Sequence, residues 1–188
     1  MTTSPGQRDI AELKQLWRRW AKLAIPAPSP EVHRLVVEHV RRHLDQIDGD
    51  VVTYRPMPGE VSLDELFDSH RDRLLTTRTP DEGPLTVHRA TVPMERHRFG
   101  FDQPTAEAPE ADRSRIGAVL VPAVLFGRDG TRLGHGAGYY DRLLPTIPAT
   151  AHRIAISWSA MTVASVPVDG HDVPMTHLVT EGGLVELA

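Results

Sequence analysis

The sequence has no cysteine among its 188 residues. Disulfide bonds, catalysis by a thiolate and zinc sites ligated by cysteine are therefore excluded. Long apolar runs are missing as well: residues 1–8 contain no apolar stretch, and no later run approaches the length needed to span a bilayer. From these absences we expect a cytoplasmic protein that has no membrane partner.

The sequence also lacks an excess of either charge, because its net charge is only −4 and both signs are spread along the chain. No general attraction to nucleic acid is expected, so an anionic ligand needs a local cluster of cations. Hydrophobic residues make up 40% and charged residues 24%, which is ordinary for a globular protein. We expect one domain over residues 1–188, acting as a monomer.

Hydrophobic periodicity alternates between helix and strand along the chain. Apolar residues recur at helical spacing over 9–24, and again in a helix that begins near Ser29, a residue suited to an N-cap. The strongest strand is the continuous apolar run 116–121, which is typical of a parallel strand buried on both faces. Further predicted strands are 50–54, 74–77, 85–92, 153–157 and 178–187; further helices are 62–73 and 138–144, and 103–115 is predicted to be an exposed loop.

This alternation predicts a single layered α/β/α domain with a mostly parallel central sheet, similar to a Rossmann fold. The segment with the clearest chemical signal runs from Gly127 to Asp141 and has alternating glycines at 134, 136 and 138. Such glycines let the backbone approach a ligand closely and adopt positive φ. Because the loop follows the strongest strand and precedes a helix, we expect free N–H groups there to bind a phosphate.

Two charged side chains extend this hypothesis. Arg132 adds a fixed cation, and Asp141 is placed to hold Mg²⁺ together with phosphate oxygens. The loop is neither a Walker-type P-loop, since no Gly-Lys-Ser/Thr follows, nor a dinucleotide-binding fingerprint, since the third glycine has the wrong spacing. As a bare pattern, three alternating glycines also fit a tight strand-to-helix turn without any ligand.

The residues around the loop resemble the signature of the 5-formyltetrahydrofolate cyclo-ligase family. The similarity covers Val121-Pro122 through Phe126, and then Gly130-x-Arg132-Leu133-Gly134-x-Gly136-x-Gly138-Tyr139-Tyr140-Asp141. Further similar pieces follow in order from Lys14 to the end of the chain: Lys14-x-x-x-Arg18, Glu60, Gln103-Pro104 and His171-Asp172.

The resemblance implies an enzyme that uses ATP and Mg²⁺ to convert 5-formyltetrahydrofolate to 5,10-methenyltetrahydrofolate, with release of ADP and phosphate. It implies substrate binding by Arg55 and Glu60, metal binding by Asp141 and Asp172, and catalysis by Arg132, His135 and Tyr140. The ATP-binding residues that it implies are Lys14, Arg18, Arg132, Leu133, Gly134, His135, Gly136, Ala137, Gly138, Tyr139 and Tyr140.

Some positions depart from the family pattern. His135 stands where a large basic residue is usual, and histidine is only partly charged near neutral pH. Phe99 stands where tryptophan is common, within a segment (78–101) that matches poorly. Two alternatives stay open: a non-catalytic relative that binds nucleotide or folate, which His135 motivates, and an enzyme acting on a sugar phosphate or coenzyme A, which are ligands of related layered α/β folds.

Simpler structural interpretations also stay open for single residues. Lys14 and Arg18 fit a solvated helix edge, and Asp172 fits a turn before Pro174. His39 and His43 share a helix face at four-residue spacing, which suits a metal pair or two histidines at the edge of the core.

Overall fold

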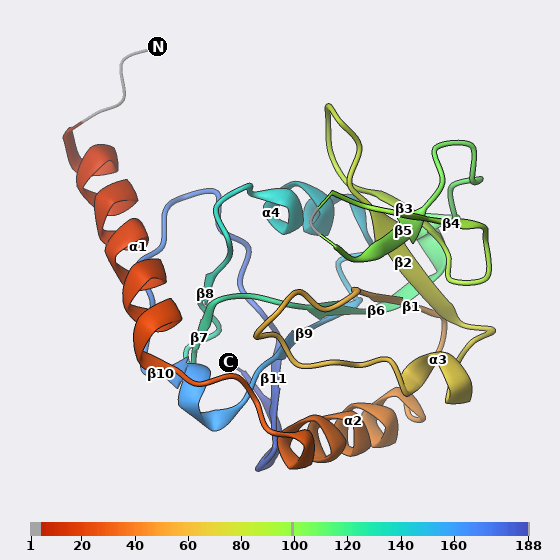
Figure 1. Ribbon diagram of the computed structural model, residues 1–188, viewed down its shortest axis with the longest axis horizontal. Helices are drawn as coiled ribbons and strands as arrows, with labels where there is room; N and C mark the ends of the chain where they lie inside the picture. Colours follow the sequence, from red (N-terminus) through yellow and green to blue (C-terminus); the bar gives the residue numbers. More distant parts are fainter. Residues whose placement is uncertain (1–4, 99, 188) are drawn as a thin grey trace.

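A computed structural model of the chain describes residues 5–98 and 100–187. A seven-stranded sheet runs through the middle of the molecule, with helices on both of its faces (Figure 1). Its strand order is β12-β11-β9-β6-β1-β2-β3. The strands are β1 (Asp50–Thr53), β2 (Leu74–Arg78), β3 (Thr86–Arg89), β6 (Ile116–Val121), β9 (His152–Ile156), β11 (His177–Thr180) and β12 (Gly183–Glu186).

The five inner strands are parallel, and only the edge strands β12 and β3 are antiparallel to their neighbours. The predicted α/β class with a mostly parallel sheet is therefore confirmed. That the whole chain forms one domain stays a prediction, although this sheet joins segments from Asp50 to Glu186.

Successive residues of the inner strands are buried on opposite faces of the sheet, as the pleat requires. Val51, Leu120 and Ile154 belong to one core cluster, whereas Val52 and Val119 belong to the other. The first cluster packs against α2 (Pro30–Leu44) and the single turn α3 (Leu66–Ser69), and the second against α4 (Tyr139–Leu143). Both faces are covered, which is why the strands read as continuous apolar runs.

The remaining elements form smaller units. The helix α1 (Pro5–Ala24) packs through Trp17 and Ala21 on a three-stranded sheet of β10, β7 and β8, at one end of the molecule (Figure 1). Their bounds are β7 (Leu125–Gly127), β8 (Arg132–Leu133) and β10 (Thr162–Val163), while β4 (Met94–Arg96) and β5 (Asp102–Pro104) form a hairpin. Single 3₁₀ turns lie at Arg113–Arg115, Leu144–Thr146 and Ser159–Met161. No helix in the described ranges is long and apolar enough to cross a membrane.

The sequence predictions hold for most elements and are wrong for a few. Ser29 caps α2 as expected, its Oγ accepting a hydrogen bond of 3.3 Å from the Val32 amide. The helix predicted over 62–73 is wrong in extent, because α3 is only one turn. The strand predicted over 178–187 is a hairpin of β11 and β12. The segment 103–115 is mostly exposed, but its start forms part of β5 and Gln103 is buried.

One glycine fixes the pairing of the two central strands. Asp50 pairs with Ile116 and Val51 with Ala118, so Gly117 is the extra residue of a β-bulge. A Cβ on Gly117 would lie 1.9 Å from the carbonyl oxygen of Asp48, well inside van der Waals contact. Only glycine therefore fits this position of the sheet.

We predict that Gly117→Ala destabilises the protein by about 1–3 kcal/mol, the range for overpacking, because Asp48 contributes a backbone atom that cannot rotate away. The matched control is Gly182→Ala, at an exposed turn where an added Cβ meets only a side-chain oxygen at 3.5 Å. Urea unfolding followed by circular dichroism measures both variants. Equal midpoints for the two variants would contradict the assigned bulge.

Candidate active site

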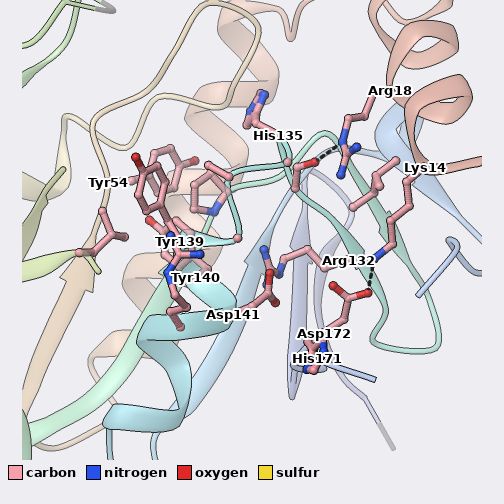
Figure 2. Close-up of a pocket in the computed structure, with 18 of the residues that line it drawn as sticks. Lys14, Arg18, Tyr54, Arg132, His135, Tyr139, Tyr140, Asp141, His171 and Asp172 are labelled. Atoms are coloured by element: carbon pink, nitrogen blue, oxygen red, sulfur yellow. Dashed lines mark hydrogen bonds and ion pairs between the residues drawn. The ribbon is translucent and has the colours of Figure 1, made fainter. Parts of the chain in front are cut away.

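A cleft of about 1350 Å³ opens at the carboxyl ends of the parallel strands (Figure 2). The chain leaves β1 at Tyr54 and β6 at Pro122, and both residues line the cleft. From β1 the chain continues to β2 on one side, and from β6 it continues to β9 on the other side. The cleft thus lies at the switch point of the sheet, where open α/β folds bind their ligands.

The glycine loop forms one wall of this cleft. Gly136 has φ +108° and Gly138 has φ +64°, so both adopt the left-handed conformation that favours glycine. The loop does not follow β6 directly as predicted, because the β7–β8 hairpin lies between them. The helix after the loop has only five residues, so its dipole contributes less to anion binding than we expected from the sequence.

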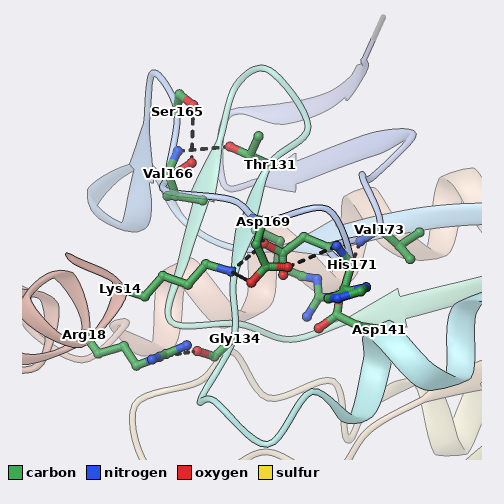
Figure 3. A network of polar contacts seen from close by, with 12 residues as sticks. Lys14, Arg18, Thr131, Gly134, Asp141, Ser165, Val166, Asp169, His171 and Val173 are labelled. Carbon is green, nitrogen blue, oxygen red and sulfur yellow. Dashed lines mark hydrogen bonds and ion pairs between the residues drawn. The ribbon is translucent and has the colours of Figure 1, made fainter. Parts of the chain in front are cut away.

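Lys14 reaches the cleft from α1 and lies between two carboxylates (Figure 3). Its Nζ is 2.9 Å from Asp169 Oδ2 and 2.5 Å from Asp172 Oδ2. Burial opposes the charge of the ammonium group, yet the hydrogen bonds to the aspartates raise the pKa of Lys14. The solvated-edge interpretation of Lys14 is therefore wrong, since the residue is only 8% exposed. Asp172 is likewise more than a turn residue.

Arg18 lies one helical turn further along α1, against the glycine loop. Its Nε donates a 2.7 Å hydrogen bond to the Gly134 carbonyl, and its Cζ would be 3.5 Å from a Cβ at Gly136. Burial lowers the pKa of Arg18, opposed by the charge of Asp172. Among the described residues, the two terminal nitrogens of Arg18 have no hydrogen-bonding acceptor, which leaves them available to an anion in the cleft.

Arg132 completes a set of three cations around the loop. Its guanidinium is ion-paired with Asp141 and lies near the ring of Tyr140, with Cζ 5.9 Å from the ring centroid. Arg132 is 6% exposed, and its buried Nε has no hydrogen-bonding partner within 5–98 and 100–187. An unpaired buried donor is rare in a folded protein, so this nitrogen indicates a ligand or water that completes the site.

The two predicted metal ligands, Asp141 and Asp172, both line the cleft. Asp141 Oδ1 accepts from Arg132 and from the Val173 amide at 3.3 Å, whereas Asp172 Oδ2 accepts from Lys14 and the Asp169 amide. Their other oxygens, Asp141 Oδ2 and Asp172 Oδ1, accept no hydrogen bond from the described residues. Carboxylate oxygens are the ligands that Mg²⁺ prefers, so this donor set fits the ion.

The predicted substrate residues lie on the segment that follows β1. The carboxylate of Glu60 is held by the Met57 amide at 2.8 Å and by His135 Nε2 at 3.0 Å. Arg55 Cζ lies 3.7 Å from the ring centroid of Phe67, and the guanidinium forms an ion pair with Asp64. The buried Nε of Arg55 has no partner among the described residues. Glu60 and Arg55 are thus positioned by local contacts before any ligand binds.

Two phenols also line the cleft (Figure 2): Tyr54 is buried and Tyr140 is half-buried. Burial, and then the negative charge of Glu60, raise the pKa values of Tyr54 and Tyr140 well above the ordinary value. Both hydroxyl groups are therefore protonated at neutral pH, and that of Tyr54 donates to the Val61 carbonyl at 2.7 Å. In this state Tyr140 can donate a hydrogen bond to a ligand but cannot act as a base.

Every site residue predicted from the sequence lines this one cleft, together with residues that the sequence analysis missed. Asp169 is the clearest omission, and its spacing from Asp172, in Asp-Gly-His-Asp, was the available signal. Tyr54 was predicted only as the end of a strand. Phe99 lies outside the described residues. The sequence analysis paired His43 with His39, whereas the structure brings the rings of His152 and His177 into contact with that of His43.

A family model described as "5-formyltetrahydrofolate cyclo-ligase family" matches residues 7–181. The chain belongs to this family. The match covers nearly all of the sequence, and so it confirms the resemblance predicted from the loop motif and from the shorter pieces on either side of it.

Relatives and solved structures agree with this membership. A 5-formyltetrahydrofolate cyclo-ligase of Mycolicibacterium smegmatis is 40% identical over 91 residues, which span 47% of each chain. One of Haemophilus influenzae is 23% identical, over 77% of this chain and 83% of that protein. The structure of 5,10-methenyltetrahydrofolate synthetase from Aquifex aeolicus superposes with a TM-score of 0.73 at 27% identity, covering 95% of this chain and 92% of that one.

We predict that Asp141→Asn destabilises the fold by about 3 kcal/mol, because it leaves the buried guanidinium of Arg132 without its counter-charge. The sequence alone predicted Asp141 as a ligand of Mg²⁺ and did not reveal its ion pair with Arg132. The control is Glu31→Gln, which breaks an exposed ion pair with Arg34 and should hardly change stability. Thermal unfolding checks both variants. An unchanged melting temperature for Asp141→Asn would show that the pair contributes nothing to stability.

Proposed function

We propose that the chain catalyses the ATP- and Mg²⁺-dependent cyclisation of 5-formyltetrahydrofolate to 5,10-methenyltetrahydrofolate. In this reaction the formyl oxygen attacks the γ-phosphorus of ATP, the bond from that phosphorus to the β–γ bridging oxygen breaks, and ADP leaves. The second folate nitrogen then attacks the activated formyl carbon and closes the ring. The C–O bond breaks, and phosphate departs with the former formyl oxygen and with the proton that the ring-closing nitrogen loses.

The observation that carries this proposal is the convergence of three cations on the glycine loop at the switch point of the sheet. Phosphoryl transfer needs its charge neutralised and its acceptor held in line, and it needs little covalent chemistry from the protein. Lys14 keeps one of its three donors unused, and Arg18 and Arg132 each keep donors without a described acceptor. We assign the ATP phosphates to these donors and to the backbone N–H groups of 134–138.

The substrate contacts follow from the opposite wall of the cleft. The carboxylate of Glu60 accepts hydrogen bonds, and the pterin ring of a folate presents N–H donors that such a carboxylate can orient. His135 bridges the two walls through its 3.0 Å contact with Glu60, so it is proposed to link substrate orientation to phosphate binding. Arg55 is proposed as a second substrate contact, and Tyr140 as a neutral donor to the reacting oxygens.

Mg²⁺ would be held by Asp141 and Asp172, and it would supply positive charge to the phosphate oxygens. In this structure Lys14 and Arg132 neutralise these carboxylates. When Mg²⁺ binds the carboxylates, the phosphate oxygens would accept hydrogen bonds from Lys14 and Arg132 instead. Around this site we propose a monomer in the cytoplasm, with no nucleic-acid or membrane partner.

The first test is turnover. Purified protein incubated with 5-formyltetrahydrofolate is expected to form methenyltetrahydrofolate, followed by its absorbance, only when ATP and Mg²⁺ are both present. ADP and phosphate should appear in equal amounts to the product. Binding of both ligands without any product would instead support a non-catalytic relative, which the histidine at position 135 motivates. Failure to bind the folate, with ATP bound, would favour a sugar phosphate or coenzyme A substrate.

The second test concerns Lys14. Lys14→Ala removes a charged donor to the phosphates, so ATP affinity is expected to fall about 10- to 150-fold, the effect of losing one charge-assisted hydrogen bond. Lys22→Ala is the matched control, because it removes an exposed lysine from the same helix outside the cleft. Isothermal titration calorimetry on folded protein measures both. If ATP affinity fell equally in the two variants or in neither, Lys14 would have no role in binding phosphate.

A further inference from the structure

A second group of potential ligands lies at the opposite end of the parallel strands. His43 near the end of α2, His152 at the start of β9 and His177 at the start of β11 each offer a ring nitrogen, and these nitrogens lie within 4.8 Å of one another. The cleft opens at the carboxyl ends of the strands, whereas His152 and His177 are the first residues of theirs. None of the three histidines lines the cleft.

We propose that His43, His152 and His177 form a site for a divalent transition metal, with Zn²⁺ as the ion of choice. Three imidazoles from three different elements are a donor set that suits Zn²⁺, and Mg²⁺ does not favour it. The site goes beyond the proposed reaction, because it shares no residue with the cleft.

The distances suit tetrahedral coordination. His43 Nε2 and His152 Nδ1 are 3.2 Å apart. Two nitrogens bound to one tetrahedral Zn²⁺ at about 2.0–2.1 Å lie about 3.3–3.4 Å from each other. These two atoms therefore already have nearly the spacing of one edge of the tetrahedron. The rings of His152 and His177 are stacked, with their centroids 4.5 Å apart. One of these rings would therefore turn about its χ2 angle to point a nitrogen at the ion.

The hydrogen bonds around His177 are compatible with an unprotonated Nε2. The hydroxyl of Thr176 lies 3.2 Å from the Arg153 carbonyl and 2.8 Å from His177 Nδ1, and when it donates to the carbonyl it accepts from Nδ1. His177 Nδ1 then carries the ring proton, and Nε2 keeps its lone pair. Metal-ligating histidines usually donate their other ring nitrogen in this way, which fixes the orientation of the ring.

The charge state also suits metal binding at neutral pH. Burial, and then the charges of His152 and His43, lower the pKa of His177 to about 4, and burial and His152 lower the pKa of His43. Both rings are therefore neutral at pH 7, as metal ligands must be. Glu186 on β12 pairs with His177 across the sheet, and its negative charge opposes both pKa shifts, but its carboxylate does not belong to the group of ligand atoms within 4.8 Å of one another.

The test uses the full chain, free of any histidine tag and stripped of metal with a chelator. Isothermal titration with ZnCl₂ at pH 7.5, in excess MgCl₂ to occupy the carboxylates of the cleft, is expected to show one site of micromolar or tighter affinity. His43→Ala and His152→Ala should each weaken it at least tenfold. His39→Ala is the matched control, on the same helix but outside the cluster, and should leave the affinity unchanged.

A second readout separates this site from the cleft and from unfolding. Zn²⁺ should raise the melting temperature of the wild-type protein and of Asp172→Asn, but not that of His43→Ala, whose fold is checked by circular dichroism. Because His177 is buried, it is tested with the more conservative His177→Gln, which should also weaken Zn²⁺ binding at least tenfold. The proposal is overturned if the wild type binds no Zn²⁺, or if His39→Ala weakens binding as much as His43→Ala. Loss of Zn²⁺ binding in Asp172→Asn would overturn it too, by locating the ion in the cleft.

Discussion

The geometry of the molecule depends on the pairing of β1 with β6, two parallel strands from which the chain departs in opposite directions. Segments that return to the sheet pass to one side after β1 and to the other after β6, so neither covers the gap between the strand ends. The Gly117 bulge shifts the register of these strands by one residue, and the two apolar clusters hold them from both faces. The cleft is a consequence of this topology, and its chemistry comes from the segments that border it.

Much of the fold could be predicted because its signals are local. The run Ile116–Val121 is apolar at every position except Gly117, as expected for a strand covered on both faces. Ser29 caps its helix through a residue three positions away. The helix predicted over 62–73 is only one turn long, because the spacing of Leu63 and Leu66 fits a short turn and the segment before it as well as it fits a longer helix. The sequence around Gln103 predicts a loop, yet its side chain accepts a hydrogen bond from the Thr79 amide. The neighbouring residues in the sequence do not reveal this partner.

In the candidate site, too, the residues that could be predicted are those whose signal is local in the sequence. The glycines at 136 and 138 were predictable because positive φ is a local requirement, and the loop motif is specific to its family. The partners of Lys14 were not, because its ammonium meets carboxylates 155 and 158 positions away. His43 shows the same limit. Helical spacing pointed to His39 as its partner, but the fold places His152 and His177, the first residues of two strands, next to it. Pairings across the sheet depend on topology, which periodicity alone does not determine.

The contact of Lys14 with Asp169 and Asp172 also has an evolutionary consequence. A buried ammonium and two carboxylates form one electrostatic unit, so the loss of either sign leaves an uncompensated charge in a confined space. Substitutions in the first helix and in the loop before β11 are therefore not independent. Among relatives of this chain, a lineage that replaces the lysine should also replace at least one aspartate. The beginning and the end of the sequence are expected to covary, although nothing in their local patterns connects them.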